Sequence, residues 1–170
     1  MAKPTPKNPV ILPTQKRSVI TFENILEATT YLIEEIGIQK ITTNKIADRS
    51  GVNINSLYQY FLDKNAIIRL ITERLLEENE TAFRQSLRNS TGLKNKERAL
   101  AIIQDSLNIF TRRPNLNREI LLYMPLIIGL EKQEQMGNLL AKSLLEVIPN
   151  ELYPSDKTKQ IAAEMLVHTF

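Results

Sequence analysis

The stretch TTNKIADRSGVNINSLYQYF, residues 42–61, decides the fold of this chain. Two short helices that cross closely need a small residue at their contact, and Ala47 supplies one. The turn between them needs a residue that tolerates positive φ, and Gly51 follows four positions later. The second helix needs an inward anchor, and Leu57 comes six positions after the glycine. This spacing predicts a helix-turn-helix.

The second helix of this motif leaves one face without apolar anchors. The side chains on that face are small or polar and suit a DNA major groove: Ile54, Asn55, Ser56 and Gln59. Asn53, directly before the helix, is a good N-cap. An ordinary helical hairpin in an all-α protein has the same spacing, so the motif alone leaves both interpretations open.

Helical periodicity continues through nearly the whole chain. We expect a first helix at residues 22–36, with Thr21 as its N-cap and Gly37 after its end. We expect Asp63 to cap a long fourth helix that reaches about residue 87. Further helices are expected after Ser155 and over three ranges: residues 96–112, 116–124 and 133–148. The sequence therefore predicts an all-α fold.

Two patterns in the second half of the chain predict how its helices pack. Residues 96–112 carry an apolar stripe that predicts the buried face of their helix: Leu100, Ile103, Leu107 and Phe110. Pro125 and Gly129 predict an interruption or a kink after residue 124, because proline removes a backbone hydrogen bond from a helix. Such a break can leave room for a small molecule.

Composition narrows the class of function. The 170 residues contain no Cys, which excludes a disulfide scaffold and a zinc finger. They contain one His and five Gly, and so few glycines argue against a Gly-rich nucleotide loop. No Ser–His–Asp or metal-ligand spacing appears, so we expect neither an enzyme nor a cofactor. No apolar run approaches the roughly 20 residues of a bilayer span, and we expect a cytoplasmic protein without membrane contact.

Positive charge is concentrated near the N-terminus. The net charge is +3, and residues 1–75 account for all of it with ten basic and seven acidic side chains. The first 17 residues carry four basic side chains and no acid: Lys3, Lys7, Lys16 and Arg17. A phosphate-bearing partner at this end and a solubilising tail both fit this distribution.

The decisive stretch also resembles the TetR (tetracycline-repressor-like) family. Ten positions match that family's signature in register: Thr43, Ile46, Ala47, Gly51, Val52, Leu57, Tyr58, Tyr60, Phe61 and Lys64. The resemblance covers about residues 22–70. It implies an N-terminal three-helix helix-turn-helix DNA-binding domain, joined by a long fourth helix to a helical domain that binds a ligand and dimerises.

On this basis we expect three parts. Residues 1–20 are predicted to be a flexible, basic, Pro-rich tail, and residues 21–66 the helix-turn-helix domain. Residues 67–170 are predicted to be the ligand-binding and dimerisation domain, incomplete at the C-terminus. The resemblance implies a dimer built from the family's last two helices, and this chain contains only the start of the first of them. Either the protein is longer than this sequence, or its dimer contact differs.

The resemblance also implies roles for individual residues. Thr43 and Lys64 correspond to phosphate contacts, and Tyr58 and Tyr60 to contacts with the sugar-phosphate backbone. The base-reading positions correspond to residues 54–56. The full set expected at DNA is Thr43, Asn44, Lys45, Asn53, Ile54, Asn55, Ser56, Tyr58, Gln59, Tyr60 and Lys64.

Two departures from the family pattern affect these roles. Asn55 is larger than the residue usual at its position, and it can hydrogen-bond an adenine edge. Phe22 stands where a basic residue is common near the start of the first helix, so the basic tail is a candidate replacement for that phosphate contact.

The implied function is a ligand-responsive repressor that binds a palindromic operator in double-stranded DNA as a homodimer. A small apolar or cationic-apolar effector would bind among Phe83, Phe110, Tyr123 and Met124. The alternative is an all-α protein-interaction module without a small-molecule response. The sequence does not distinguish repressor from activator.

Overall fold

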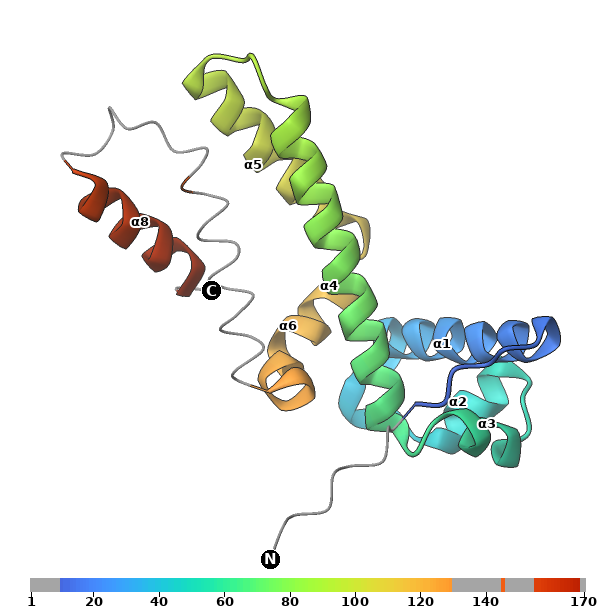
Figure 1. Ribbon diagram of the computed structural model, residues 1–170. Helices are drawn as coiled ribbons and strands as arrows, with labels where there is room; N and C mark the ends of the chain where they lie inside the picture. The colour runs from blue at the N-terminus through green and yellow to red at the C-terminus, as the bar shows by residue number, and fades with distance from the viewer. Residues whose placement is uncertain (1–9, 130–144, 146–154, 169–170) are drawn as a thin grey trace, which may run out of the picture. The chain divides into compact units, whose positions relative to one another are not determined.

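The computed structural model describes residues 10–129, 145 and 155–168, and these residues are helical almost throughout (Figure 1). The elements in chain order are α1 (Lys16–Ile36), the 3-10 helix η1 (Ile38–Lys40), α2 (Thr43–Ser50), α3 (Ile54–Tyr60), α4 (Lys64–Asn89), α5 (Asn95–Arg112), α6 (Pro114–Ile128) and α8 (Asp156–His168). The all-α prediction is confirmed. The helix predicted at residues 133–148 lies outside the described residues.

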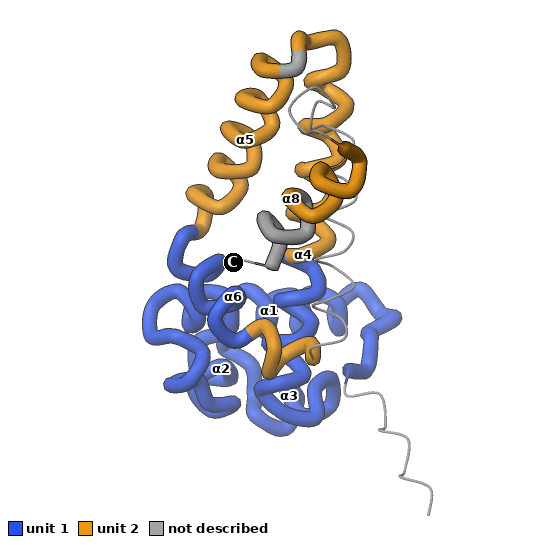
Figure 2. The backbone as a smooth tube through the Cα atoms, turned by 90° about the vertical axis from the view of Figure 1, so that its left-hand side faces the viewer, with its two compact units in different colours: residues 1–75, 114–123 blue, residues 76–113, 124–170 orange. Residues whose placement is uncertain are grey.

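The chain divides into two compact units, each built from separate stretches of sequence (Figure 2). The first contains residues 1–75 and 114–123, and the second contains residues 76–113 and 124–170. This division differs from the boundary predicted between residues 66 and 67. The first turns of α4 and most of α6 belong to the unit that carries the helix-turn-helix.

The first helix begins earlier than predicted. α1 starts at Lys16, and the Val19 N–H donates to the Gln15 carbonyl at 3.0 Å. Thr21 therefore lies inside the helix, where its hydroxyl donates to the Arg17 carbonyl instead of capping. The last proline before this helix is Pro13, so nothing in residues 16–21 stops the helical hydrogen bonds from forming.

The segment just ahead of α1 is also ordered against the first unit, although a flexible tail was predicted through residue 20. Val10 and Phe61 form an isolated antiparallel β-bridge, and the Ile11 N–H donates to the Tyr60 carbonyl at 2.8 Å. The prediction of a flexible tail is therefore wrong for residues 10–20.

The core of the first unit lies where α1 packs against α2 and α3. Phe22 is 1% exposed, and its ring stacks on Phe61 with centroids 4.8 Å apart. Leu57 and Ile46 are completely buried. The position at which the family often has a basic residue is thus an aromatic core position in this chain.

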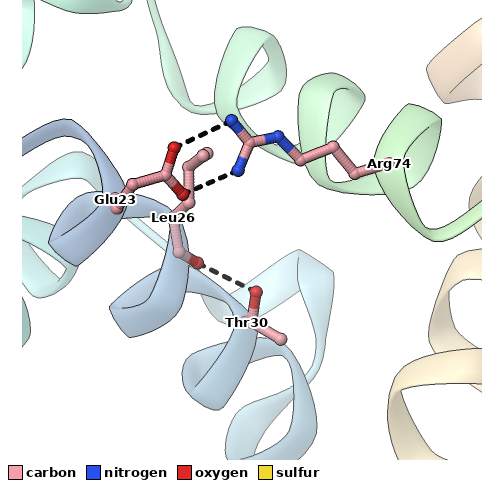
Figure 3. A network of polar contacts seen from close by, with 4 residues as sticks. All are labelled: Glu23, Leu26, Thr30 and Arg74. Atoms are coloured by element: carbon pink, nitrogen blue, oxygen red, sulfur yellow. Dashed lines mark hydrogen bonds and ion pairs between the residues drawn. The ribbon is translucent and has the colours of Figure 1, made fainter. Parts of the chain in front are cut away.

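An ion pair links α1 to the first-unit part of α4 (Figure 3). The Arg74 guanidinium donates to both carboxylate oxygens of Glu23, at 2.7 and 2.9 Å. These hydrogen bonds, and secondarily the positive charge of Arg74, hold the pKa of Glu23 below its ordinary value against the opposing effect of partial burial. Neighbouring Leu26 accepts from the Thr30 hydroxyl within the same helix.

α6 continues through Pro125 to Ile128, so an interruption directly after residue 124 is wrong, and the alternative, a kink at Pro125, stays a prediction. A proline inside a helix removes one N–H donor but leaves the remaining hydrogen bonds of that helix available. Gly129, with φ of 82°, follows the end of the helix. In the described part of the chain, no helix is long and apolar enough to cross a membrane.

The buried face predicted for α5 is wrong. The four residues of the predicted stripe are between 46% and 59% exposed in the described structure: Leu100, Ile103, Leu107 and Phe110. Ile102 is 3% exposed instead, and Asp105 accepts from the Ser86 hydroxyl of α4 at 2.6 Å. α5 has apolar residues on two faces, and periodicity cannot tell which of them meets α4.

Candidate nucleic-acid interface

The turn between α2 and α3 has the predicted geometry. Gly51 adopts φ 66° and ψ 22°, which is the left-handed conformation. The Val52 N–H then donates to the Ala47 carbonyl at 3.1 Å, which closes the end of α2. Thr42 caps the start of α2 by accepting from the Lys45 N–H. Both ends of α2 are therefore capped, the first by Thr42 and the second at Gly51.

α3 presents the predicted polar face. The Asn53 side chain accepts from the Asn55 N–H at 2.9 Å, as an N-cap should, and Leu57 anchors the helix from below. Side chains of Asn55, Tyr58 and Gln59 are exposed, and those of Ile54 and Ser56 are half-buried. This face is backed by a buried anchor and is open to an incoming partner.

A hydrogen bond joins the start of α2 to the last turn of α3. The Thr43 hydroxyl lies 3.0 Å from the Tyr58 hydroxyl, and the Tyr58 side chain is half exposed. Thr43 is the first residue of α2, where backbone N–H groups lack helical partners and the helix dipole is positive. The two hydroxyls and this helix start can therefore meet one phosphate together.

Tyr60 differs from Tyr58. Its ring is half-buried and meets the Phe22 ring edge-on at 5.8 Å. One part of the Tyr60 ring thus belongs to the core of the first unit. Only the exposed part of this side chain is available for the predicted contact with the sugar-phosphate backbone.

The two candidate lysines hydrogen-bond backbone carbonyls. The Lys64 ammonium donates to the Ile41 carbonyl at 2.9 Å, and the Lys45 ammonium donates to the Lys40 carbonyl at 3.0 Å. Each ammonium has three N–H donors, so two remain for other acceptors. Both charges are held beside the α2 start, and Asn44 is exposed in the first turn of the same helix.

Other charges near α2 are engaged away from the motif. Arg49 donates to both carboxylate oxygens of Glu35, at 3.3 and 2.8 Å, and lies 5.8 Å from the centre of the Tyr31 ring. This pair ties the end of α2 to α1. Sequence reasoning did not find it, because the two residues lie on different helices and nothing in their spacing pairs them.

Glu119 of α6 makes a second contact that the sequence did not indicate. Its carboxylate accepts from the Ile38 N–H at 3.0 Å, and its side chain is 14% exposed. Gly37 makes room for this approach, because a Cβ at residue 37 would lie 2.9 Å from the carboxylate. The corner between α1 and α2 is therefore fastened to a helix 81 residues further along the chain.

The proposed effector residues are divided between the units. Tyr123 belongs to the first unit, and Phe83, Phe110 and Met124 belong to the second. Met124 is buried, Phe83 is half-buried and Phe110 is exposed. The effector pocket therefore stays a prediction. Among the described residues, no group of acidic or histidine side chains is placed to hold a metal ion.

Known proteins share the motif region. Residues 25–71 match the model of a family described as bacterial regulatory proteins, tetR family. Over 57 residues the chain is 37% identical to the tetracycline repressor protein class A from transposon 1721 of Escherichia coli. This aligned stretch covers 34% of this chain and 26% of that protein. Over 84 residues it is 27% identical to the HTH-type transcriptional regulator BetI of Cronobacter sakazakii, covering 49% and 42%. The chain thus matches less than half of the length of either curated relative.

Solved structures resemble nearly the whole chain. The fatty acid degradation regulator FadR from Bacillus halodurans aligns with a TM-score of 0.69 at 17% identity, covering 93% of this chain and 82% of that one. A gamma-butyrolactone receptor (ArpA-like protein) aligns with a TM-score of 0.65 at 18% identity, covering 91% and 82%. At this identity the likeness shows the fold: an N-terminal helix-turn-helix followed by a helical C-terminal part.

Proposed function

Because this chain belongs to the tetR family of bacterial regulatory proteins, we propose that it is a sequence-specific DNA-binding transcription regulator. The observation that carries the proposal is the exposed polar face of α3, anchored from below by the fully buried Leu57. A rigid helix with such a face can enter a major groove, where each base pair has a distinct pattern of donors and acceptors.

In this proposal the base contacts come from α3. Asn55 can donate to and accept from an adenine edge, Gln59 can do the same one turn later, and Ile54 can contact a thymine methyl. Ser56 and the amide of Asn53, whose oxygen caps the helix, add adaptable polar contacts. These groups would carry the sequence preference.

The phosphate contacts come from around this helix. Thr43 and Tyr58, joined at 3.0 Å, would meet one phosphate at the start of α2. Lys45 and Lys64 would contribute positive charge there, with Asn44 and the exposed part of Tyr60 as further donors. Contacts of this kind set affinity and register without reading sequence.

We propose further that the protein acts as a dimer on a palindromic operator and that a small molecule releases it. A two-fold dimer places two recognition helices about 34–36 Å apart, one turn of B-DNA. Its relatives include proteins named tetracycline repressor, which supports repression. An apolar or cationic-apolar effector among Phe83, Phe110, Tyr123 and Met124 would act through its preference for a spacing that does not fit the operator.

A binding experiment tests the central proposal. The parent protein selects duplexes from a random-sequence library, and its affinity for a recovered 30-base-pair duplex is measured against a scrambled duplex over a series of salt concentrations. We expect a preference for the recovered duplex and a steep salt dependence. Failure to recover any sequence, with weak and salt-insensitive binding, would instead favour a protein-interaction module.

Two variants assign the reading face. Asn55→Ala should lower affinity for the recovered duplex by about five- to 100-fold, the usual effect of one lost base contact, with little change on the scrambled duplex. Asn108→Ala removes an exposed amide from α5 of the second unit and serves as the matched control. Equal behaviour of the two variants would contradict the role of α3.

A further inference from the structure

The segment ahead of α1, residues 10–14, holds the end of α3, and we call it the N-terminal strap. The Ile11 N–H donates to the Tyr60 carbonyl at 2.8 Å, and Val10 forms a β-bridge with Phe61. Tyr60 is the last residue of α3. Its carbonyl is one of the groups that a helix leaves without an internal partner, so the strap satisfies it from outside.

The strap is extended because of its sequence. Pro13 fixes its own φ and disfavours a helical conformation at the residue before it, Leu12. The side chains of Ile11 and Leu12 are 63% and 67% exposed. Burial of these two side chains therefore does not explain why this segment lies against α3. The backbone contacts attach it, together with the half-buried Val10 and Pro13.

α3 needs an external hold because it is short. It has seven residues, fewer than two turns, and its only buried residue is Leu57. The Asn53 cap fixes its start. Its end is held by the Phe22 ring, which packs on Tyr60 and Phe61, and by the strap on the backbone of the same two residues.

We propose that the N-terminal strap is a positioning element that sets the orientation of α3 and thereby the sequence selectivity of this protein. The inference rests on the proposed DNA-binding function. Hydrogen bonds to base edges require close geometry, whereas contacts from lysine to phosphate tolerate a shift. Loosening the end of α3 should therefore weaken specific binding much more than non-specific binding.

The test removes one donor. Ile11→Pro lacks the N–H that reaches Tyr60, and Ile11→Ala keeps it while shortening the exposed side chain. Leu12→Pro is the positional control, because it adds a proline next to the strap donor. The N–H that it removes, that of Leu12, bonds no other residue that the structure describes. All variants are titrated with a 30-base-pair duplex selected by the parent and with its scrambled counterpart, at one salt concentration.

We expect Ile11→Pro to lower the ratio of specific to non-specific affinity about tenfold, and Ile11→Ala and Leu12→Pro to leave it within about twofold. This ratio separates orientation from stability, because a smaller folded fraction lowers both affinities by the same factor. If Ile11→Pro does not fold, the α-hydroxy analogue of isoleucine at residue 11 removes the same N–H without a ring.

Two results would overturn the inference, and they differ. If the parent selects a duplex and the donor-less protein keeps its affinity ratio, the strap does not position α3, and the proposed function stands. If the parent selects no duplex at all, the proposed function fails and the strap proposal fails with it.

Discussion

The contact between Gly37 and Glu119 can be measured by a double-mutant cycle. Glu119→Ala removes a carboxylate that accepts from the Ile38 N–H at 3.0 Å. A hydrogen bond to a charged group contributes about 1.5–3 kcal/mol to stability. Because the Glu119 side chain is only 14% exposed, we expect its hydrogen bond with Ile38 to contribute within this range. We expect a loss of about 2 kcal/mol, or a fall in Tm of about 4–8 °C for a chain of this size.

Gly37→Ala should act on the same contact. Residue 37 has φ 77° and ψ 158°, a region that only glycine occupies readily, so an alanine there carries about 1–3 kcal/mol of strain. Its Cβ would also lie 2.9 Å from the Glu119 carboxylate and displace it. When Glu119→Ala is already present, only the strain remains. The two changes should therefore be non-additive by about 1.5–3 kcal/mol.

Urea unfolding of the parent, both single variants and the double variant gives this coupling energy. Glu119→Gln keeps an acceptor without the charge and should lie between the parent and Glu119→Ala. Leu122→Ala changes a residue of α6 that is 65% exposed, and it is the control. Additivity within about 0.5 kcal/mol would show that α6 does not depend on this contact to hold the α1–α2 corner.

Three further outcomes are expected. Gly51→Val should destabilise by about 1–2 kcal/mol in a thermal melt, from backbone strain alone, because a Cβ there meets no atom within 4 Å. Glu23→Gln should cost less than about 1 kcal/mol above neutral pH, since the ion pair of Glu23 with Arg74 is half exposed. Because the pKa of Glu23 is lowered in the folded protein, the ion pair stabilises at high pH, and its contribution is lost as the pH falls through that lowered pKa. Thermal melts of parent and variant should therefore converge in acid. Lys64→Ala should weaken all DNA binding and reduce the log–log salt slope by about 0.9, with a small loss of stability from the freed Ile41 carbonyl. An unchanged slope together with lost sequence preference would contradict its phosphate role.

The helix-turn-helix was predictable because each of its defining features depends on the conformation of the local backbone. The left-handed turn at Gly51, the cap at Asn53 and the buried anchor at Leu57 each depend on the residue itself and its near neighbours. The cap of α4 was predictable for the same reason, since Asp63 accepts from the Ala66 N–H three residues on. Local rules of this kind can be read from the sequence.

Features that depend on distant partners were not predictable. Nothing near Glu119 in the sequence indicates that it reaches Ile38, and nothing near Ile11 indicates Tyr60. The buried face of α5 was wrong because apolar residues occupy two of its faces. The DNA contacts and the effector residues remain predictions.

The first unit is discontinuous, and this has a consequence for how the protein is made. Leu116 and Ile120 are almost fully buried, and they lie on the stretch of α6 that belongs with residues 1–75. A ribosome that has synthesised only the helix-turn-helix and the start of α4 has therefore not yet supplied part of that unit's interior. The remaining apolar surface of the first unit is covered only when residues 114–123 have been synthesised. This happens after the whole of α4 and α5 has emerged. A fragment that ends at Leu75 should likewise be less stable than the same residues in the intact chain.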